Sequence, residues 1–398
     1  MKTWYFSEQS YPPAWDAPVP PKITSPSALV DPVTANRLLW DYLAECDLAD
    51  ELGFNIMVNE HHAAYTCMSV SCMVTLGILA SRTKKARLLA LGVPLLNRLD
   101  PVRIAEEIAY VDTLSGGRLE VGLVKGSPFE PFVSNTNTAR GMDRYWEAHD
   151  LIIKALTTHD GAFSWEGQYF QYRNVNVIPR CYQQPTPQMW VTTLGSTTTA
   201  REAARLNYVL GITANAQGAR MAYPSYREEF EKVHGRHAPL DRFAFLGYVG
   251  IGSDEATGLN RAERVLKFVE TSERISPNYL NPPGYLSHAD NARMLGGGAA
   301  VTHRLKVLPD GTPMSPKPVV NEYVQNGVMF AGNPDQVYEQ IERIYESVGG
   351  FGNFLLQTGG TLGTDEVRDE LRLFANEVQP RLDRLTAKYQ PQSNRSAA

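Results

Sequence analysis

The stretch RLLALGVPLLNRLDPVRIAEEIAYVDTLSGGRLEVGLV, residues 87–124, contains the pattern that decides the fold. Residues 87–93 form a nearly continuous apolar run, which is typical of a strand covered on both faces. Pro101 then stands where helices accept proline, and residues 115–117 are a helix-stop signal. The buried stripe of this helix consists of Ile104, Ala105, Ile108, Val111 and Leu114. Residues 118–124 form the next strand, so the stretch predicts two parallel strands joined by a crossover helix.

The same alternation of strand and helix extends over the rest of the chain. Further strands are expected at residues 3–7, 55–58, 188–193, 208–213, 242–251 and 353–357. Further helices are expected at about residues 34–52, 70–80, 139–158, 217–234, 254–271, 334–348 and 364–378. Eight strands, each paired with a helix, predict the α/β class and a parallel (β/α)8 TIM barrel.

The length of 398 residues exceeds the roughly 250 of an ordinary barrel, and the surplus lies in three segments. We expect a single domain over residues 1–398 with insertions at about 12–32, 159–187 and 276–327. The Pro-rich insertion at 12–32 is expected to lack regular structure. The insertion at 276–327 precedes the last βα unit and is a candidate lid; a surface excursion or a dimer arm is the alternative.

The composition argues against nucleic acids and membrane surfaces as partners. The chain has 38 basic and 43 acidic side chains, a formal net charge of −5, and no basic block that would attract nucleic acid or an anionic membrane surface. Residues 1–8 lack the apolar stretch of a secretory signal, and the uncharged run at 61–81 reads as a loop and a buried helix rather than a membrane span. The four cysteines show no CxxC spacing, so we expect reduced core thiols, no metal site and a cytoplasmic protein.

Functional groups of a barrel gather where its strands end. After the second strand the chain reads Asn59-Glu60-His61-His62, without the spacing of the usual histidine metal sites. His61 is a candidate general acid, base or hydrogen-bond donor, with a structural histidine as the alternative. At the end of the third strand, Gly92 and Val93 would begin a dry floor for a ring system, with ordinary strand-end packing as the alternative.

A candidate phosphate seat lies at the next two strand ends. The fifth strand is followed by Leu194-Gly195-Ser196-Thr197-Thr198, a glycine- and hydroxyl-rich turn that opens a helix and so presents free N–H groups and a positive dipole end. Lys125, at the end of the fourth strand, would supply a countercharge. A plain helix cap beside a surface lysine is the alternative. No GxGxxG motif is present, so a nicotinamide dinucleotide fold is not indicated.

Short motifs in order along nearly the whole chain resemble the bacterial luciferase-like family of flavin-dependent monooxygenases. They are ELGF (51–54), EHH (60–62), DPVRIAEE (100–107), DTLSGGR (112–118), GNP (332–334) and FANEVQP (374–380). The resemblance implies a TIM barrel that binds reduced FMN, which reacts with molecular oxygen through a flavin peroxide. A small organic molecule, with aromatic and heterocyclic compounds among the candidates, would be oxidised.

The resemblance also implies roles for single residues. His61 matches the first histidine of the family's Glu-His-His motif near the flavin, and Lys125 falls where luciferase has a phosphate-binding arginine. The turn at 195–198 matches the family's phosphate loop, and Arg144 resembles another cation near that phosphate, with Arg140 as the alternative. Gly92-Val93 matches the strand end where some members hold a non-prolyl cis peptide beneath the flavin.

The remaining expectations concern the substrate pocket and the partners. Glu60 is expected to set the tautomer of His61 or to close the site. Trp4, Phe6, Tyr65 and Phe129 are candidates for an aromatic substrate pocket, with core packing as the alternative. A separate NAD(P)H:flavin reductase would deliver reduced FMN, and the family's habit suggests a homodimer. Two alternatives stay open: a deazaflavin-dependent oxidoreductase that transfers hydride without oxygen, and a non-catalytic flavin-binding partner subunit.

Overall fold

The fold is a closed barrel of eight parallel strands. The computed structural model describes residues 1–398 except 214, 280–281, 286–307, 310–311 and 389–398. The barrel strands are, in order around the barrel, β1 (Lys2–Phe6), β2 (Asn55–Val58), β3 (Leu88–Pro94), β4 (Leu119–Val124), β7 (Gln188–Thr193), β8 (Val209–Ile212), β9 (Phe243–Ile251) and β11 (Asn353–Gln357). Pairing of β8 with β9 and of β11 with β1 closes the circle. The predicted α/β class and TIM barrel are confirmed.

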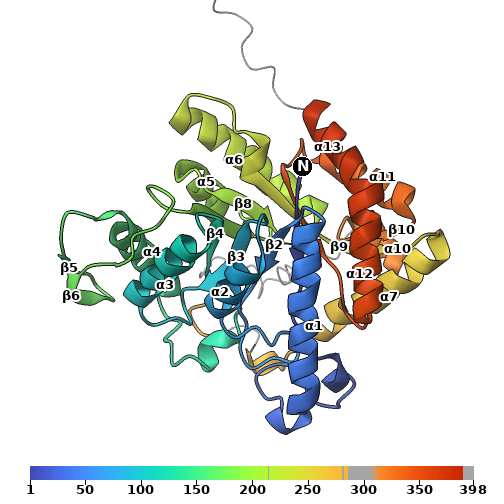
Figure 1. Ribbon diagram of the computed structural model, residues 1–398, viewed down its shortest axis with the longest axis horizontal. Helices are drawn as coiled ribbons and strands as arrows, with labels where there is room; N and C mark the ends of the chain where they lie inside the picture. Colours follow the sequence, from blue (N-terminus) through green and yellow to red (C-terminus); the bar gives the residue numbers. More distant parts are fainter. Residues whose placement is uncertain (214, 280–281, 286–307, 310–311, 389–398) are drawn as a thin grey trace, which may run out of the picture.

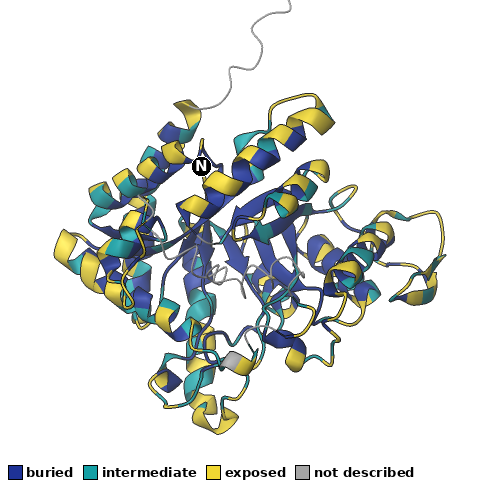
Figure 2. Ribbon diagram, turned by 180° about the vertical axis from the view of Figure 1, so that it is seen from behind, coloured by how far each residue is buried: buried dark blue, intermediate teal, exposed yellow. Residues whose placement is uncertain are grey.

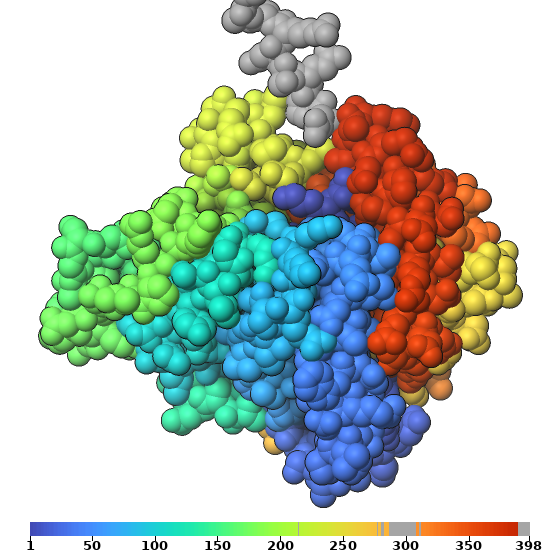
Figure 3. Space-filling view, viewed as in Figure 1, coloured from blue at the N-terminus to red at the C-terminus, as the bar shows by residue number. Residues whose placement is uncertain are grey.

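Helices surround the barrel and cover its strands (Figure 1). They are α1 (Pro32–Glu51), α2 (Cys72–Arg82), α3 (Pro101–Leu114), α4 (Gly141–Thr157), α5 (Thr197–Arg205), α6 (Ala216–His234), α7 (Glu255–Ser272), α11 (Pro334–Ser347) and α12 (Thr364–Leu373). A π-helical turn (Phe374–Val378) continues α12 into α13 (Gln379–Lys388). The space-filling view shows these C-terminal helices beside α1, so the two ends of the chain close the ring together (Figure 3).

The structure contains β-strands that the sequence did not predict. β10 (Met329–Gly332) pairs in parallel with the second half of β9, whose first half pairs with β11. Within the 159–187 insertion, β5 (Phe163–Glu166) and β6 (Gln171–Val175) form an antiparallel hairpin outside the barrel. The hairpin projects from one edge of the molecule in Figure 1.

The barrel interior is a packed core. It contains the buried side chains of Trp4, Phe6, Met57, Leu89, Leu91, Trp190, Val209, Ala244, Leu246 and Leu355. The rings of Trp4 and Trp190 meet edge to face with centroids 5.3 Å apart, and Trp4 Nε1 donates to Asn353 Oδ1 at 3.0 Å. Asn353 begins β11, so this bond lies at the end of the barrel away from the strand C-termini. Trp4 is therefore a core residue and not part of a substrate pocket.

A second core lies between the strands and the surrounding helices. Every residue of β3 is buried, as expected for a strand covered on both faces, and the buried strands form the centre of the molecule in Figure 2. Leu91 points into the barrel interior, whereas Val93 packs in the outer core. Apolar burial on both sides of the strands supplies the main stabilisation of such a barrel.

The 12–32 insertion is more ordered than its proline content predicts. It holds two short 3-10 turns, at Pro12–Ala14 and Ser27–Leu29, and α1 begins at Pro32 with Asp31 as its cap. Tyr11 and Trp15 are buried against Tyr65 and Phe268, which ties the insertion to the barrel.

The 276–327 insertion is described only in part. Its residues 280–281, 286–307 and 310–311 lie outside the described residues, so the lid interpretation of this segment stays a prediction. At its end, α10 (Val320–Asn326) leads into β10, and Val320 and Tyr323 are buried beside α7.

A buried carboxyl group on α12 joins two strand ends. Glu370 is 2% exposed, accepts a hydrogen bond from the Ile251 backbone at 2.9 Å and bonds to the Thr358 hydroxyl. Burial raises the pKa of Glu370 from 4.5 to about 8. Because the folded chain then holds this proton more tightly than the unfolded chain, the free energy of unfolding falls as pH rises from 4.5 through about 8.

We expect Glu370→Gln to remove that loss of unfolding free energy, which the shift from 4.5 to about 8 makes roughly 4 to 5 kcal/mol. Urea unfolding of the wild type and the variant at about pH 5 and about pH 9 measures it. Glu366→Gln is the control, because Glu366 lies on the same helix but is ion-paired with Arg264 near the surface. An unchanged pH dependence in Glu370→Gln would contradict the assignment.

Candidate functional site

A charged pair lies at the rim formed by the strand C-termini. His61, in the loop after β2, places Nδ1 2.8 Å from Oε1 of Glu130, in the loop after β4. The Glu130 side chain is fully buried, and that of His61 is 29% exposed. Glu130 also accepts hydrogen bonds from the backbone N–H of His62 at 3.2 Å and of Ser127 at 2.8 Å. Since a carboxylate accepts, Nδ1 of His61 carries the proton in this contact.

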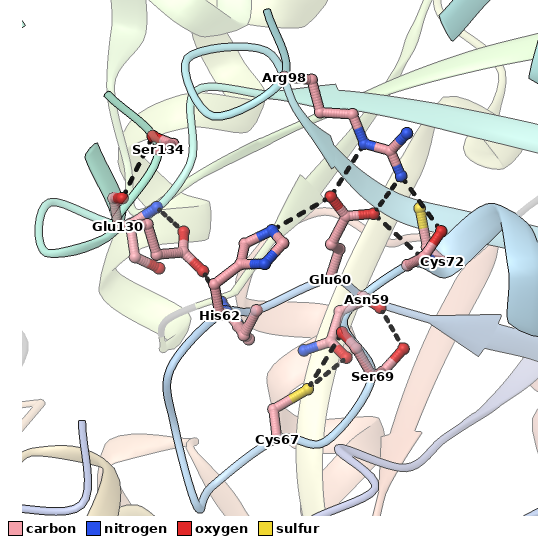
Figure 4. Close-up of polar contacts among 12 residues, drawn as sticks. Asn59, Glu60, His62, Cys67, Ser69, Cys72, Arg98, Glu130 and Ser134 are labelled. Atoms are coloured by element: carbon pink, nitrogen blue, oxygen red, sulfur yellow. Dashed lines mark hydrogen bonds and ion pairs between the residues drawn. The ribbon is translucent and has the colours of Figure 1, made fainter. Parts of the chain in front are cut away.

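Glu60, the neighbour of His61, is held by other groups (Figure 4). Arg98 makes a two-pronged contact with its carboxylate, Nε to Oε1 at 2.9 Å and Nη2 to Oε2 at 2.6 Å. Nε2 of His62 lies 3.4 Å from Oε1, and the Cys72 N–H at the start of α2 donates to Oε2. Burial opposes ionisation of Glu60, but hydrogen bonds from His62 and Arg98 outweigh it and lower the pKa to about 2.

These contacts correct the expected relation between Glu60 and His61. The carboxylate at hydrogen-bond distance from the His61 ring belongs to Glu130, while both oxygens of Glu60 face Arg98. Arg98 also pairs with Glu107 at 2.6 Å, which anchors the rim loops to α3. Glu60 therefore fixes the shape of the rim and does not set the tautomer of His61.

Two more charged groups face His61. Glu8, in the loop after β1, accepts a hydrogen bond from Asn59 Nδ2 at 2.6 Å, and burial raises its pKa. Lys22, in the 12–32 insertion, donates to the Ser272 carbonyl at 2.7 Å and lies 5.0 Å from the ring centre of Phe129. Burial lowers the pKa of Lys22. Loops from three different parts of the chain thus bring a compact set of charges to this side of the rim.

The turn after β7 has the form of an anion seat. The Thr193 hydroxyl accepts from the N–H groups of Gly195 and Ser196, and Ser196 caps α5 by accepting from the Thr199 N–H at 3.3 Å. Ser196 and Thr198 are exposed, and Thr197 is half-buried. Gly195 has φ +133°, and a Cβ atom there would approach Gly218 of α6 to 3.1 Å. The hydroxyls and the N–H groups at the start of the helix can donate hydrogen bonds to a phosphate group. These residues therefore fit the phosphate of FMN at this point.

The two expected cations have other contacts. Lys125 donates to the backbone carbonyl of Tyr285, and its ammonium group lies 3.6 Å from the ring centre of that tyrosine. Arg144, on α4, stacks its guanidinium 4.8 Å from the ring centre of Phe170. Among the described residues, Nε of Arg144 is buried without a hydrogen-bond partner. No contact of the described chain joins either cation to the turn at 195–198.

The expected floor of the site consists of backbone more than of side chains. The peptide between Leu91 and Gly92 is cis. A Cβ atom on Gly92 would come within 2.6 Å of the Gly122 carbonyl oxygen, so the close approach of β3 and β4 requires glycine here. Because the Val93 side chain packs in the outer core, only the backbone of these residues is placed to face a ring at the barrel mouth.

The candidate pocket aromatics fall in three places. Phe129 lies beside the rim pair, with its ring centre 6.4 Å from that of His61. Phe6 is the last residue of β1 and packs in the barrel interior, 3% exposed. Tyr65 packs under the 12–32 insertion, with its hydroxyl on the Pro26 carbonyl. Phe129 alone of these three contacts the charged rim, and Tyr65 holds the insertion in place.

Sequence reasoning missed Glu130, Lys22, Glu8 and Arg98. Each lies in a loop and belongs to no motif, so their shared signal was only a charged residue following a strand or within an insertion. Within the described part of the chain, no group of three or more histidine, cysteine or acidic side chains has metal-binding geometry. None of the helices in that part is long and apolar enough to cross a membrane.

The curated relatives match part of the chain. A flavin-dependent trigonelline monooxygenase, oxygenase component, from Acinetobacter baylyi is 28% identical over 169 residues, which are 40% of this chain and 45% of the relative. The chain spans slightly less than half the length of the first curated relatives it matches.

Solved structures share the fold over nearly the whole chain. The oxygenating constituent of 3,6-diketocamphane monooxygenase from Pseudomonas putida, a Type II Baeyer-Villiger enzyme in complex with FMN, aligns with a TM-score of 0.69 and 17% identity over 96% of this chain and 98% of its own. An F420-dependent secondary alcohol dehydrogenase with an F420-acetone adduct aligns with a TM-score of 0.62 and 16% identity over 85% and 94%.

The family assignment comes from the sequence as a whole. The family model described as luciferase-like monooxygenase matches residues 32–350, which include six of the eight barrel strands; β1 and β11, which pair to close the ring, lie outside the match. The chain therefore belongs to the luciferase-like monooxygenase family.

Proposed function

We propose that the protein is the oxygenase component of a flavin-dependent monooxygenase that uses reduced FMN and molecular oxygen to oxidise a small organic substrate. The observation that carries the proposal is that one barrel rim holds both the His61–Glu130 pair and the phosphate-type turn at 195–198. FMN needs an anion seat, and the substrate needs a group that manages protons beside it.

In this proposal each part of the rim has one task. Ser196, Thr197 and Thr198 bind the phosphate with the N–H groups that begin α5, and Lys125 adds a positive charge. The Gly92-Val93 backbone supports the ring system. Reduced FMN, when bound, supplies the electrons that activate oxygen. His61 donates a hydrogen bond at the reacting end, and Phe129 offers an aromatic substrate a face to pack against.

The electron source and the location belong to the same proposal. A relative is named an oxygenase component, which supports a separate NAD(P)H:flavin reductase as the source of reduced FMN. All four cysteines are buried free thiols, which fits the reducing conditions of the cytoplasm.

An oxygen electrode tests the proposed reaction. We expect the protein with reduced FMN and a panel of aromatic and heterocyclic substrates to consume oxygen in proportion to product, and coenzyme F420 to support no turnover. A shared fold with an F420-dependent dehydrogenase makes F420 the informative comparison. Anaerobic turnover with reduced F420 would replace the proposal by hydride transfer. Flavin binding without turnover on any substrate would favour the non-catalytic partner subunit.

Lys125→Ala should weaken FMN binding by about 1 to 3 kcal/mol, as expected for a lost charge-assisted hydrogen bond. Quenching of FMN fluorescence during titration measures the dissociation constant. Lys154→Ala is the control, because Lys154 lies on α4 against Phe163 and Trp165, away from the rim. An unchanged dissociation constant in Lys125→Ala would remove Lys125 from the proposed phosphate site.

The proposed homodimer has a candidate surface. Neighbouring helices α2 and α3, which lie on the face seen in Figure 3, have exposed apolar side chains, among them Val74 at 64% and Tyr110 at 58%. We expect light scattering to give a dimer for the wild type and a monomer for the double variant Val74→Glu, Ile78→Glu. Val233→Glu on α6 is the control and should stay dimeric. A monomeric wild type would remove the dimer from the proposal.

A further inference from the structure

The His61 ring has one nitrogen committed and one available. Its Nδ1 meets Glu130 at 2.8 Å, while the side chain keeps 29% of its surface exposed. The two ring nitrogens point in different directions, so the contact with Glu130 leaves Nε2 to act on a ligand. The orientation of the ring is therefore set by Glu130.

Glu130 is a charged group that is shielded from solvent. Its side chain is completely buried, and its donors are the His61 ring and the backbone N–H groups of His62 and Ser127. Burial opposes its charge, but the hydrogen bond and charge of His61 and the Ser127 N–H outweigh burial and lower its pKa. Buried carboxylates are as a rule paired with a positive charge, and His61 is the ionisable group in hydrogen-bond contact with Glu130.

The other charged groups around His61 also favour a positive charge on its ring. Glu8 faces it from the loop after β1 and Lys22 from the 12–32 insertion, so two carboxylates, counting Glu130, oppose one ammonium group. The Cys67 thiol, on the same loop as His61, stays neutral because burial raises its pKa. Burial disfavours a charged His61, but the hydrogen bond and charge of Glu130 and the charge of Glu8 raise its pKa overall.

We propose that Glu130 is a positioning residue that holds His61 as an imidazolium ion, so that Nε2 donates a hydrogen bond into the barrel mouth and cannot accept one. Its meaning for catalysis rests on the proposed function: His61 would act as a donor or acid toward an oxygen atom, not as a general base. The charge state itself is a property of the protein without flavin.

Nitrogen NMR of the histidine rings in flavin-free protein tests the proposal. The chain has eight histidines, and loss of one signal in His61→Gln assigns the ring. We expect His61 to be protonated on both nitrogens at neutral pH. Glu130→Gln should weaken its proton affinity roughly tenfold or more, and Glu8→Gln should weaken it less. His149, a residue of α4 that pairs with Asp150 and Tyr208 instead of Glu130, should titrate as in the wild type.

A neutral His61 at pH 7 in the wild type would overturn the proposal, even if Glu130→Gln fails to fold. An unchanged His61 titration in a folded Glu130→Gln would overturn it too. The pH profile of oxygen consumption separates this inference from the proposed function. If both hold, turnover falls as pH rises through the pKa of His61, and Glu130→Gln moves that fall to lower pH. An imidazolium in the NMR spectrum with no oxygen consumption would leave the positioning role intact and contradict the monooxygenase.

Discussion

Replacing His61 with alanine should lower oxygen-coupled turnover by about 10²- to 10⁴-fold, the usual effect of removing a general acid or base. The reason is that His61 is an ionisable group of the rim whose ring is fixed by Glu130 while its side chain stays 29% exposed. The affinity for FMN should change little, because the proposed phosphate seat lies after β7 and His61 after β2. Steady-state oxygen uptake and FMN fluorescence titration measure the two effects separately.

His62→Ala is the matched control for this prediction. His62 is adjacent in the chain and equally exposed, 30% against 29%, but its ring faces Glu60 instead of Glu130. We expect its turnover to stay within about tenfold of the wild type. Equal losses in the two variants would assign the effect to distortion of the rim loop, and full turnover in His61→Ala would remove the histidine from the mechanism.

Replacing Glu60 with alanine should cost on the order of 3 kcal/mol of folding stability, the largest loss of stability expected at the rim. Removing one partner of a buried ion pair leaves the other charge without compensation. Glu60 is 1% exposed and holds Arg98 by two hydrogen bonds, so its loss leaves a guanidinium that is 17% exposed with the more exposed Glu107 as its remaining ion-pair partner. Urea unfolding of the ligand-free protein measures the difference.

The pH dependence of folding stability is a second test of the ion pair between Glu60 and Arg98. Because the folded-state pKa of Glu60 is about 2 and its ordinary value is 4.5, the ion pair contributes fully above pH 4.5 and is lost as pH falls through about 2. Glu60→Ala should therefore lose stability relative to the wild type at neutral pH and approach it in acid. Glu107→Ala, which removes the more exposed partner of Arg98, should cost less. A Glu60→Ala variant as stable as the wild type would contradict a structural role.

The barrel could be predicted because its signals are local. Parallel strands buried on both faces read as short apolar runs, and the run at 87–93 is separated from the next strand by a helix with Pro101 at its start. β10 was missed because its pairing with the second half of β9 is set by the tertiary structure. The β5–β6 hairpin was missed because its strands are only four and five residues long and Val175 is their one buried residue, which leaves little apolar pattern in the sequence.

Only those residues of the candidate site that directly follow a strand could be predicted from the sequence. Position after a strand was enough to select His61 and the turn at 195–198. The partner of His61 lies 69 residues further along, in a loop whose path the local pattern does not determine. The contact of Glu60 with Arg98 likewise spans 38 residues, so sequence proximity to His61 suggested the wrong partner. Charge pairing across loops is a consequence of the closed barrel.

The most direct test of the proposed monooxygenase is the fate of isotopically labelled dioxygen. The protein, a flavin reductase, NAD(P)H, FMN and the substrate that stimulates oxygen uptake would be incubated under labelled dioxygen, and the product analysed by mass spectrometry. The proposed function requires a product that carries label from dioxygen, with His61→Ala forming little of it. A product that forms equally well without oxygen, or that carries oxygen only from water, would contradict the monooxygenase.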